Sequence, residues 1–282
     1  MTLLADFAAS DRLLHRISGP EQAPVLVYVP GIHGDWTPMV NCRGYLARRL
    51  RLVELAYPWR ARWLLDDFAD ALAAKLDELG IESAHLLAES FGSIVGWQFA
   101  LTRPRRVRSL LLAGGFCRPP WSSFLPAALA TMAAIPPRWV DSVIGAYIRL
   151  HAGRRDYDAD AGFPPFSASR GREGWRACRN RLRVIRATDL RRRLGEIRCP
   201  VAYVGGGRDL VVPVRREIRC LRESLHPDCR FTQWIVEGAP HPILPARPQS
   251  VANWIADRVE EAERMRSGAA EERELGVSKK DK

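Results

Sequence analysis

Alternation of strand-like and helix-like segments is the feature that most constrains the fold of this chain. Short apolar runs with the character of buried strands recur along the 282 residues, and helical patterns separate most of them. The strand-like runs fall near residues 13–17, 25–29, 52–56, 84–87, 109–112, 201–204 and 231–236. The helical patterns fall near residues 45–50, 63–79, 94–101, 213–224 and 248–262. Strands that alternate with helices are joined by right-handed crossovers, so the sequence predicts an α/β fold with a doubly wound, mostly parallel sheet.

One of the strand-like runs leads into a segment with the pattern of a tight turn from strand to helix, Ala88-Glu-Ser-Phe-Gly92. Small residues two before and two after Ser90 leave room for the close approach of strand and helix in such a turn. The turn would hold Ser90 in a strained conformation with its hydroxyl exposed. The N-terminal N–H groups of the next helix would then point at any oxyanion that forms beside it. Ser90 is therefore a candidate nucleophile.

Two later strand-like runs end in residues that could activate this serine. Asp209 follows one run across a glycine loop, and His241 lies in the loop after the last run. A serine hydroxyl needs a base within about 2.6–3.2 Å, and an imidazole that titrates near neutrality suits that role. A carboxylate would fix the tautomer of His241 and stabilise its imidazolium form, which is the role predicted for Asp209. Parallel strands end at one edge of a sheet, so we expect these side chains to meet there.

The chain order Ser, Asp, His in these contexts resembles the α/β-hydrolase superfamily, from about Val25 to Val259. The segments that carry the resemblance are residues 25–34, 88–92, 110–115 and 188–190 with 197–201, together with the Asp209 and His241 loops. Glycine is commonest at position 88 of the pattern, but Ala88 is still small. The resemblance implies an oxyanion hole formed by the N–H groups of Ile32 and Phe91, and chemistry that needs no cofactor.

Other polar residues near these motifs have alternative interpretations. Asp35, in the first glycine loop, could replace Asp209 as the acid, although a loop-capping aspartate exposed to solvent is the favoured interpretation. His33 in the same loop could line the site, but a hydrogen bond within the turn is favoured. Glu89 is expected to point away from the nucleophile and to act as a structural partner. The remaining histidines have no ligand spacing, so no metal site is predicted.

The stretch 116–187 interrupts the alternation at the place where hydrolases of this superfamily insert a cap over the site. The predicted organisation is therefore a core of residues 1–115 and 188–266, a helical cap of residues 116–187, and a disordered tail of residues 267–282. A membrane span is not expected, because the apolar run in the cap is short and is broken by prolines. For any single aromatic or methionine of the cap, packing within the cap itself is the favoured role. As a group, some should contact substrate, and the candidates are Trp121, Phe124, Met132 and Trp139.

Positive charge is concentrated in one segment of the chain, which carries a formal net charge of +11 overall. Residues 170–198 contain eleven arginines against three acidic residues. Five of these arginines recur at helical spacing, at positions 172, 176, 179, 183 and 186. Two explanations account for these arginines equally well. They could form a helix face exposed to solvent, or they could attract an anionic acyl carrier or an anionic lipid surface. Nucleic acid is not an expected partner, because the segment lacks interleaved aromatic residues and any known binding motif.

The six cysteines have no spacing typical of a disulfide framework, and the N-terminus lacks the pattern of an export signal. Both observations predict a cytoplasmic protein with reduced thiols.

Together these features predict a serine hydrolase that cleaves an ester or thioester through an acyl-enzyme, with an apolar acyl group under the cap. A serine at position 90 argues against dehalogenases and epoxide hydrolases of this fold, which have aspartate there. The fold also supports acyltransferases, aminopeptidases, cofactor-free haloperoxidases and carbon–carbon bond hydrolases, and the three residues do not separate these. A non-catalytic binding protein is a further alternative, although such proteins usually lack one of the three.

Overall fold

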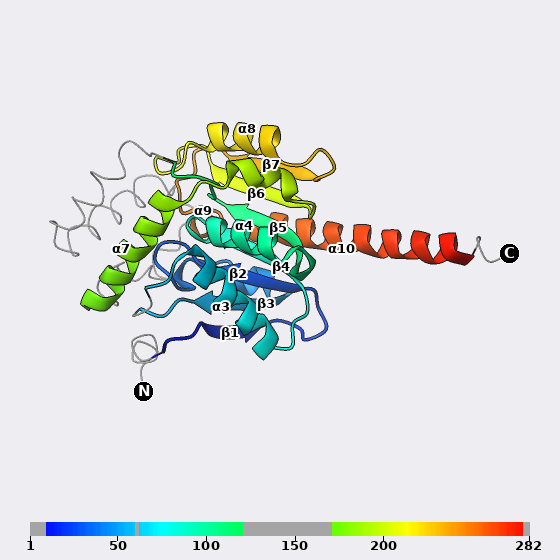
Figure 1. Ribbon diagram of the computed structural model, residues 1–282, viewed down its shortest axis with the longest axis horizontal. Helices are drawn as coiled ribbons and strands as arrows, with labels where there is room; N and C mark the ends of the chain where they lie inside the picture. The colour runs from blue at the N-terminus through cyan, green and yellow to red at the C-terminus, as the bar shows by residue number, and fades with distance from the viewer. Residues whose placement is uncertain (1–9, 60–61, 121–170, 279–282) are drawn as a thin grey trace.

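A computed structural model describes residues 10–59, 62–120 and 171–278 (Figure 1). The cap residues predicted to contact substrate, Trp121, Phe124, Met132 and Trp139, lie outside the described residues. The described part forms one sheet with helices packed on both of its faces.

The sheet has seven strands in the order β1-β3-β2-β4-β5-β6-β7. Their bounds are β1 Leu14–Ser18, β2 Val25–Val29, β3 Arg51–Ala56, β4 Ala84–Glu89, β5 Val107–Ala113, β6 Val201–Gly206 and β7 Phe231–Val236. Strand β1 pairs antiparallel with β3, and all the other neighbours are parallel. The prediction of a mostly parallel sheet is confirmed.

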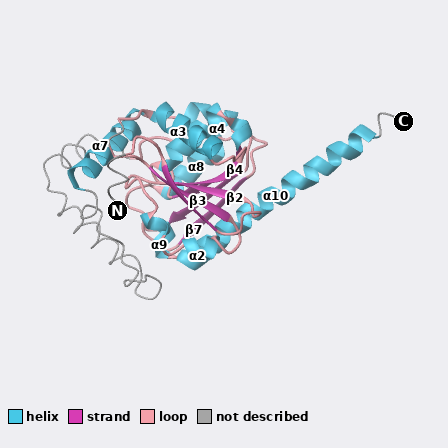
Figure 2. Cartoon of the chain, turned by 90° about the horizontal axis from the view of Figure 1, so that it is seen from below, coloured by secondary structure: helices cyan, strands magenta, loops and turns pink. Residues whose placement is uncertain are grey.

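Each face of the sheet carries its own apolar core because side chains alternate along the strands. On β2, Val27 and Val29 face one core, while Leu26 and Tyr28 face the other. Helices α3 (Leu65–Glu78), α4 (Gly92–Thr102) and α8 (Val214–Ser224) cover the first face, and α2 (Arg43–Leu46), α9 (Ile243–Ala246) and α10 (Pro248–Ser278) cover the second (Figure 2). The remaining helices are α7 (Gly171–Ala187) and the 3-10 turns η1 (Thr37–Met39), η2 (Pro104–Arg106) and η3 (Arg191–Glu196).

Helix α10 is longer than its sequence pattern predicts. Its apolar side chains from Val251 to Ala262 pack on the sheet, but the helix continues to Ser278 and extends away from the body of the protein (Figure 1). Disorder was the expectation from residue 267 onward, because that segment has too few apolar residues to form a core. Those residues include several strong helix formers, namely alanine, glutamate and arginine, and a packed helix can elongate through such a segment without forming a core.

The departure of Ala88 from the glycine-rich pattern is matched by a glycine on the helix that follows. A Cβ atom placed on Gly96 of α4 would lie 3.1 Å from the Cβ of Ala88. The lack of a side chain at Gly96 therefore leaves the space that the methyl group of Ala88 occupies.

The first residue of helix α4, Gly92, packs closely against the backbone at the end of β2. A Cβ atom on Gly92 would lie 2.3 Å from the carbonyl oxygen of Val29. We expect Gly92→Ala to lower the free energy of unfolding by about 1–3 kcal/mol, because the strand or the helix must shift to relieve this overlap. Denaturant unfolding monitored by circular dichroism measures the change. Gly44→Ala is the control, since a Cβ atom there meets nothing within 4 Å, and equal losses in the two variants would contradict the argument.

Candidate active site

Ser90 lies in a strained turn between β4 and α4. Among the residues that the structure describes, it is the one residue other than glycine with a positive φ, 47°. Its N–H donates to the carbonyl of Ala113 at 3.0 Å, and its own carbonyl accepts from the N–H of Ser93 at 2.9 Å and from the Ser93 hydroxyl at 2.5 Å. The Ser93 hydroxyl also accepts from the N–H of Phe116 at 2.8 Å. Sequence reasoning missed Ser93, which ties the turn to the end of β5.

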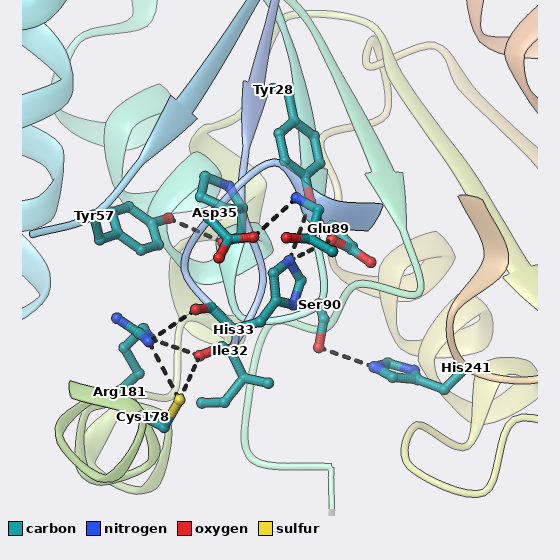
Figure 3. Close-up of polar contacts among 12 residues, drawn as sticks. Tyr28, Ile32, His33, Asp35, Tyr57, Glu89, Ser90, Cys178, Arg181 and His241 are labelled. Atoms are coloured by element: carbon teal, nitrogen blue, oxygen red, sulfur yellow. Dashed lines mark hydrogen bonds and ion pairs between the residues drawn. The ribbon is translucent and has the colours of Figure 1, made fainter. Parts of the chain in front are cut away.

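Ser90, His241 and Asp209 meet at the C-terminal edge of the sheet, as expected from parallel strands. His241 Nε2 lies 2.9 Å from Ser90 Oγ (Figure 3). His241 Nδ1 lies 2.7 Å from Asp209 Oδ2. The other oxygen of Asp209 accepts from the N–H groups of Val211 and Val212, at 2.7 and 2.8 Å. These bonds hold the carboxylate in place, and it is almost fully buried. This is an arrangement in which an imidazole can take a proton from a serine hydroxyl.

The pKa of His241 reflects two opposing influences. Burial of the ring lowers the pKa, while the negative charge of Asp209 and its hydrogen bond raise it, with a smaller contribution from Glu89. The net effect is a pKa above the ordinary value of 6.5. The carboxylate thus increases the basicity of the ring nitrogen that faces Ser90.

The two residues with predicted oxyanion donors lie on either side of the serine turn. Phe91 is the N-cap of α4, whose first N–H groups have no partner within the helix. Ile32 lies in the loop after β2, where Gly34 donates its N–H to the carbonyl of Gly31 at 3.0 Å. The Tyr57 hydroxyl donates to the carbonyl of Pro30 at the start of this loop, at 3.1 Å.

Comparison with known proteins agrees with this architecture. Residues 56–159 match the model of the alpha/beta hydrolase fold family. The chain is 28% identical over 222 residues to RutD of Variovorax paradoxus (strain S110), to which carbamate hydrolysis is attributed, and the alignment covers 71% of this chain and 80% of that protein. The chain is a hydrolase of the α/β-hydrolase fold.

Solved structures show the same fold at low sequence identity. A hydrolase from Pseudomonas aeruginosa PA01 matches with a TM-score of 0.73 and 20% identity, over 87% of this chain and 93% of its own. The enol-lactonase from Burkholderia xenovorans LB400 matches with a TM-score of 0.70 and 18% identity, over 87% of this chain and 95% of its own. The predicted fold class is confirmed. The names of these similar proteins imply different substrates, so the shared fold does not identify the substrate of this chain.

Behind the serine turn of this α/β-hydrolase lies a buried cluster formed by Glu89, Tyr28 and His33. The Tyr28 hydroxyl donates to the carboxylate of Glu89, and His33 Nε2 lies 3.4 Å from the same carboxylate (Figure 3). Burial raises the pKa of Glu89 to about 7, against the lowering effect of the hydrogen bond from Tyr28. His33 therefore contacts Glu89. Glu89 acts as the structural partner that was expected.

Asp35 caps a turn and does not reach His241 in place of Asp209. Its Oδ1 accepts from the N–H of Thr37 at 2.9 Å, at the start of η1. The cap was expected, but the side chain is buried, with 8% of the residue exposed, and is not solvated. The carboxylate in contact with the imidazole of His241 is that of Asp209.

The arginines of α7 fall into two groups, those exposed to solvent and one that is buried. Arg176 and Arg183 are exposed, whereas Arg181 is 2% exposed and turns inward against the loop that contains Ile32. Sequence reasoning counted Arg181 in the charge of the segment and found no sign of its burial. The outward side of α7 faces a cavity of about 510 Å³. Its lining residues are Trp59, Arg62, Glu173, Arg176, Ala177, Arg179, Asn180 and Arg183.

The described part of the chain holds neither a cluster of metal ligands nor a helix that could span a membrane. Within it, no three or more histidine, cysteine, aspartate or glutamate side chains gather as a metal site would require. No helix within the described residues has the length and apolar character needed to cross a membrane.

Proposed function

We propose that this α/β-hydrolase cleaves carboxylic esters or thioesters through an acyl-enzyme formed on Ser90. The observation that carries the proposal is the continuous series of contacts from Asp209 through His241 to Ser90, which ends at a serine with strained backbone. A structural serine has no need of a buried imidazole and carboxylate aligned behind its hydroxyl. Strain at one residue that also ends a hydrogen-bonded series is typical of a functional site.

The proposed chemistry follows from these positions. His241 Nε2 takes the proton of Ser90 as its Oγ attacks the substrate carbonyl carbon, and Asp209 stabilises the imidazolium that results. The N–H groups of Ile32 and Phe91 donate to the oxyanion of the tetrahedral intermediate. When the intermediate collapses, His241 gives the proton to the departing alcohol or thiol. Water then attacks the acyl-enzyme by the same steps and releases the acid.

A panel of substrates, combined with a covalent probe, tests the proposal. A fluorophosphonate should label the protein at Ser90, as located by peptide mass spectrometry. In parallel, p-nitrophenyl esters and acyl-coenzyme A thioesters of increasing chain length should show turnover that rises with the length of an apolar acyl group. Label on another serine, or turnover that Ser90→Ala leaves intact, would contradict the proposal. A protein that neither reacts with the probe nor turns over any substrate would be a binding protein.

Carbamate hydrolysis is a second candidate, and the similarity to the RutD proteins favours it. A carbamate presents the same carbonyl carbon to a serine, so the proposed residues would act on it in the same order. Adding p-nitrophenyl carbamates and simple alkyl carbamates to the panel separates the two candidates by their kcat/KM. Further alternatives are acyl transfer, aminopeptidase activity, haloperoxidase activity and carbon–carbon bond cleavage. With this panel, an acyltransferase would transfer the acyl group to an added alcohol. The other three activities would give no turnover.

The raised pKa of His241 leads to a pH prediction. A general base must be neutral, so activity is present above the pKa of His241 and is lost as the pH falls through it. We therefore expect the acid limb of kcat/KM for a neutral ester to have its midpoint above pH 6.5. Steady-state assays from about pH 5 to pH 9 measure it. A midpoint below 6.5 in the wild-type protein would contradict the argument, because burial would then outweigh the carboxylate.

The arginines around the cavity of α7 support the recruitment of an anionic acyl carrier or an anionic lipid surface. Replacing Arg176, Arg179 and Arg183 together with glutamine should raise KM for acyl-coenzyme A substrates by about tenfold and leave neutral short esters nearly unchanged. Raising the salt from about 0.1 M to 1 M shortens the Debye length from about 10 Å to 3 Å and should reproduce the effect in the wild-type protein. Equal effects on both kinds of substrate would identify a solvated helix face.

Several features predicted from the sequence stay predictions. They are the substrate contacts of the cap residues, the division of the chain into core and cap, and a cytoplasmic location with reduced thiols.

A further inference from the structure

We propose that Arg181 is a positioning residue that sets the direction of the Ile32 N–H, so that one helix of the predicted cap holds the oxyanion hole in shape. The inference rests on the proposed function, because it assigns the Ile32 N–H to the oxyanion. It concerns a residue that does not touch the substrate and acts through the backbone of the loop after β2.

The guanidinium of Arg181 reaches two consecutive carbonyl groups of this loop. Its Nε donates to the carbonyl of Ile32 at 2.7 Å, and Nη2 donates to the carbonyl of His33 at 3.3 Å (Figure 3). The Cys178 thiol, one turn earlier on α7, lies 3.3 Å from the same Ile32 carbonyl. The guanidinium carbon lies over the ring of Tyr57, 5.7 Å from the ring centroid. Helix α7 thus contacts the loop through side chains that bind backbone oxygens.

A guanidinium in this position is costly to bury, which argues against a purely packing role. No carboxylate of a described residue forms an ion pair with Arg181, so backbone oxygens replace water around the charge. Replacing a buried charged group by an apolar side chain of similar volume is often neutral or stabilising. The arginine must therefore supply something that an apolar residue would not, and directed hydrogen bonds to two carbonyls are what it supplies.

The N–H of Ile32 is held because the peptide groups on both sides of this residue are anchored. On one side, the carbonyl of Gly31, which belongs to the same peptide group as the Ile32 N–H, accepts from the N–H of Gly34 at 3.0 Å. On the other side, the Ile32 carbonyl is bound by Arg181. Peptide groups are planar, so fixing both groups leaves the Ile32 N–H one direction in which to point. Removal of the guanidinium leaves the second group to the weaker contact of the Cys178 thiol.

The loop is shaped to admit this guanidinium. Gly34 has φ of +85°, and a Cβ atom there would lie 2.8 Å from atoms of the Arg181 guanidinium. The loop therefore has no side chain at the position where the guanidinium approaches. In the same loop the Gly34 carbonyl accepts from the N–H of Tyr57 at 2.8 Å, which keeps the Tyr57 ring near the charge.

The test separates ground-state binding from stabilisation of the oxyanion. With a neutral p-nitrophenyl ester, Arg181→Met should lower kcat by about 100-fold while KM changes less than about threefold, because a misdirected donor is lost to the transition state alone. Affinity for a trifluoromethyl ketone, whose adduct with a serine carries an oxyanion, should fall by a similar factor. Arg181→Lys retains the positive charge but lacks the forked guanidinium that binds two carbonyl groups. Its kcat should lie between that of the wild type and that of Arg181→Met. Added guanidine should restore part of the activity of Arg181→Ala.

Exposed Arg222 on α8 provides the matched control, because Arg222→Met removes the same group from a helix without touching the loop. A folded Arg181→Met variant with wild-type kcat and wild-type trifluoromethyl ketone affinity would overturn the inference. If Arg181→Met does not fold, Arg181→Lys must still show the loss of kcat and of ketone affinity, and a lysine variant equal to wild type overturns it. The fluorophosphonate result on the wild-type protein stands apart: its failure rejects the proposed function, whereas labelling of the wild type with no effect at Arg181 rejects this inference alone.

Discussion

Ser90→Ala is expected to lower kcat for the best ester substrate by about 10⁴ to 10⁶-fold, because the acyl-enzyme cannot form without the Oγ nucleophile. The fold should be retained. The hydrogen bonds that shape the turn are made by the backbone of Ser90, through Ala113 and Ser93, and alanine preserves them. Stopped assays at high enzyme concentration give the residual rate, and thermal unfolding gives the stability.

The outcome is sharpest when activity and labelling are measured on the same samples. The wild-type protein should gain the mass of one fluorophosphonate adduct, and Ser90→Ala should gain none. A variant that keeps more than about a tenth of the wild-type kcat would show that Ser90 is not the nucleophile. An adduct that persists in Ser90→Ala would locate the reactive group elsewhere.

Asp209→Asn should lower kcat by about 10⁴-fold while the loop stays in place. An asparagine oxygen can still accept from the N–H groups of Val211 and Val212, so the turn after β6 keeps its shape. With the oxygen held there, the amide nitrogen faces His241, donates to Nδ1 and holds the wrong tautomer. The imidazolium also loses the carboxylate that stabilises it. Single-turnover rates with a p-nitrophenyl ester measure the loss of the chemical step.

Asp35→Asn is the matched control, because it makes the same change in a buried aspartate of a neighbouring loop. It should lose some stability at η1 and keep most of the activity. If Asp35→Asn were inactive and Asp209→Asn active, the acid would be Asp35. In Asp209→Asn, the acid limb of the pH profile should also move to lower pH, since the charge that raises the pKa of His241 is gone.

Local patterns made the sheet and the serine turn predictable. Each strand is marked by a short apolar run, and the edge at which Ser90, Asp209 and His241 meet follows from strand direction alone. Ala88 and Gly92 identified the serine turn because close packing of a helix on a strand excludes larger side chains, and Gly92 does lie against the backbone of β2.

Contacts between distant segments were not predictable in this way. Arg181 looks like the other arginines of its segment, and its burial depends on how α7 lies against a loop about 150 residues earlier in the chain. The contact between His33 and Glu89 was not predictable for the same reason. His33 follows β2 and Glu89 ends β4, so the contact depends on the pairing of these two strands in the sheet. The length of α10 was missed because low hydrophobicity was taken to exclude structure, whereas a helix needs no core once it is anchored at one end.

The contact of α7 with the loop after β2 has a consequence for how proteins of this kind can diversify. An insertion that merely sits above a site can be exchanged for another by recombination, and the new enzyme inherits a working catalytic core. Here helix α7, Gly171–Ala187, carries side chains that bind the backbone of that loop. A crossover placed at residue 187 would therefore remove part of the core's own support, whereas a crossover before residue 171 would keep it. The unit of this hydrolase that must be inherited together therefore includes α7.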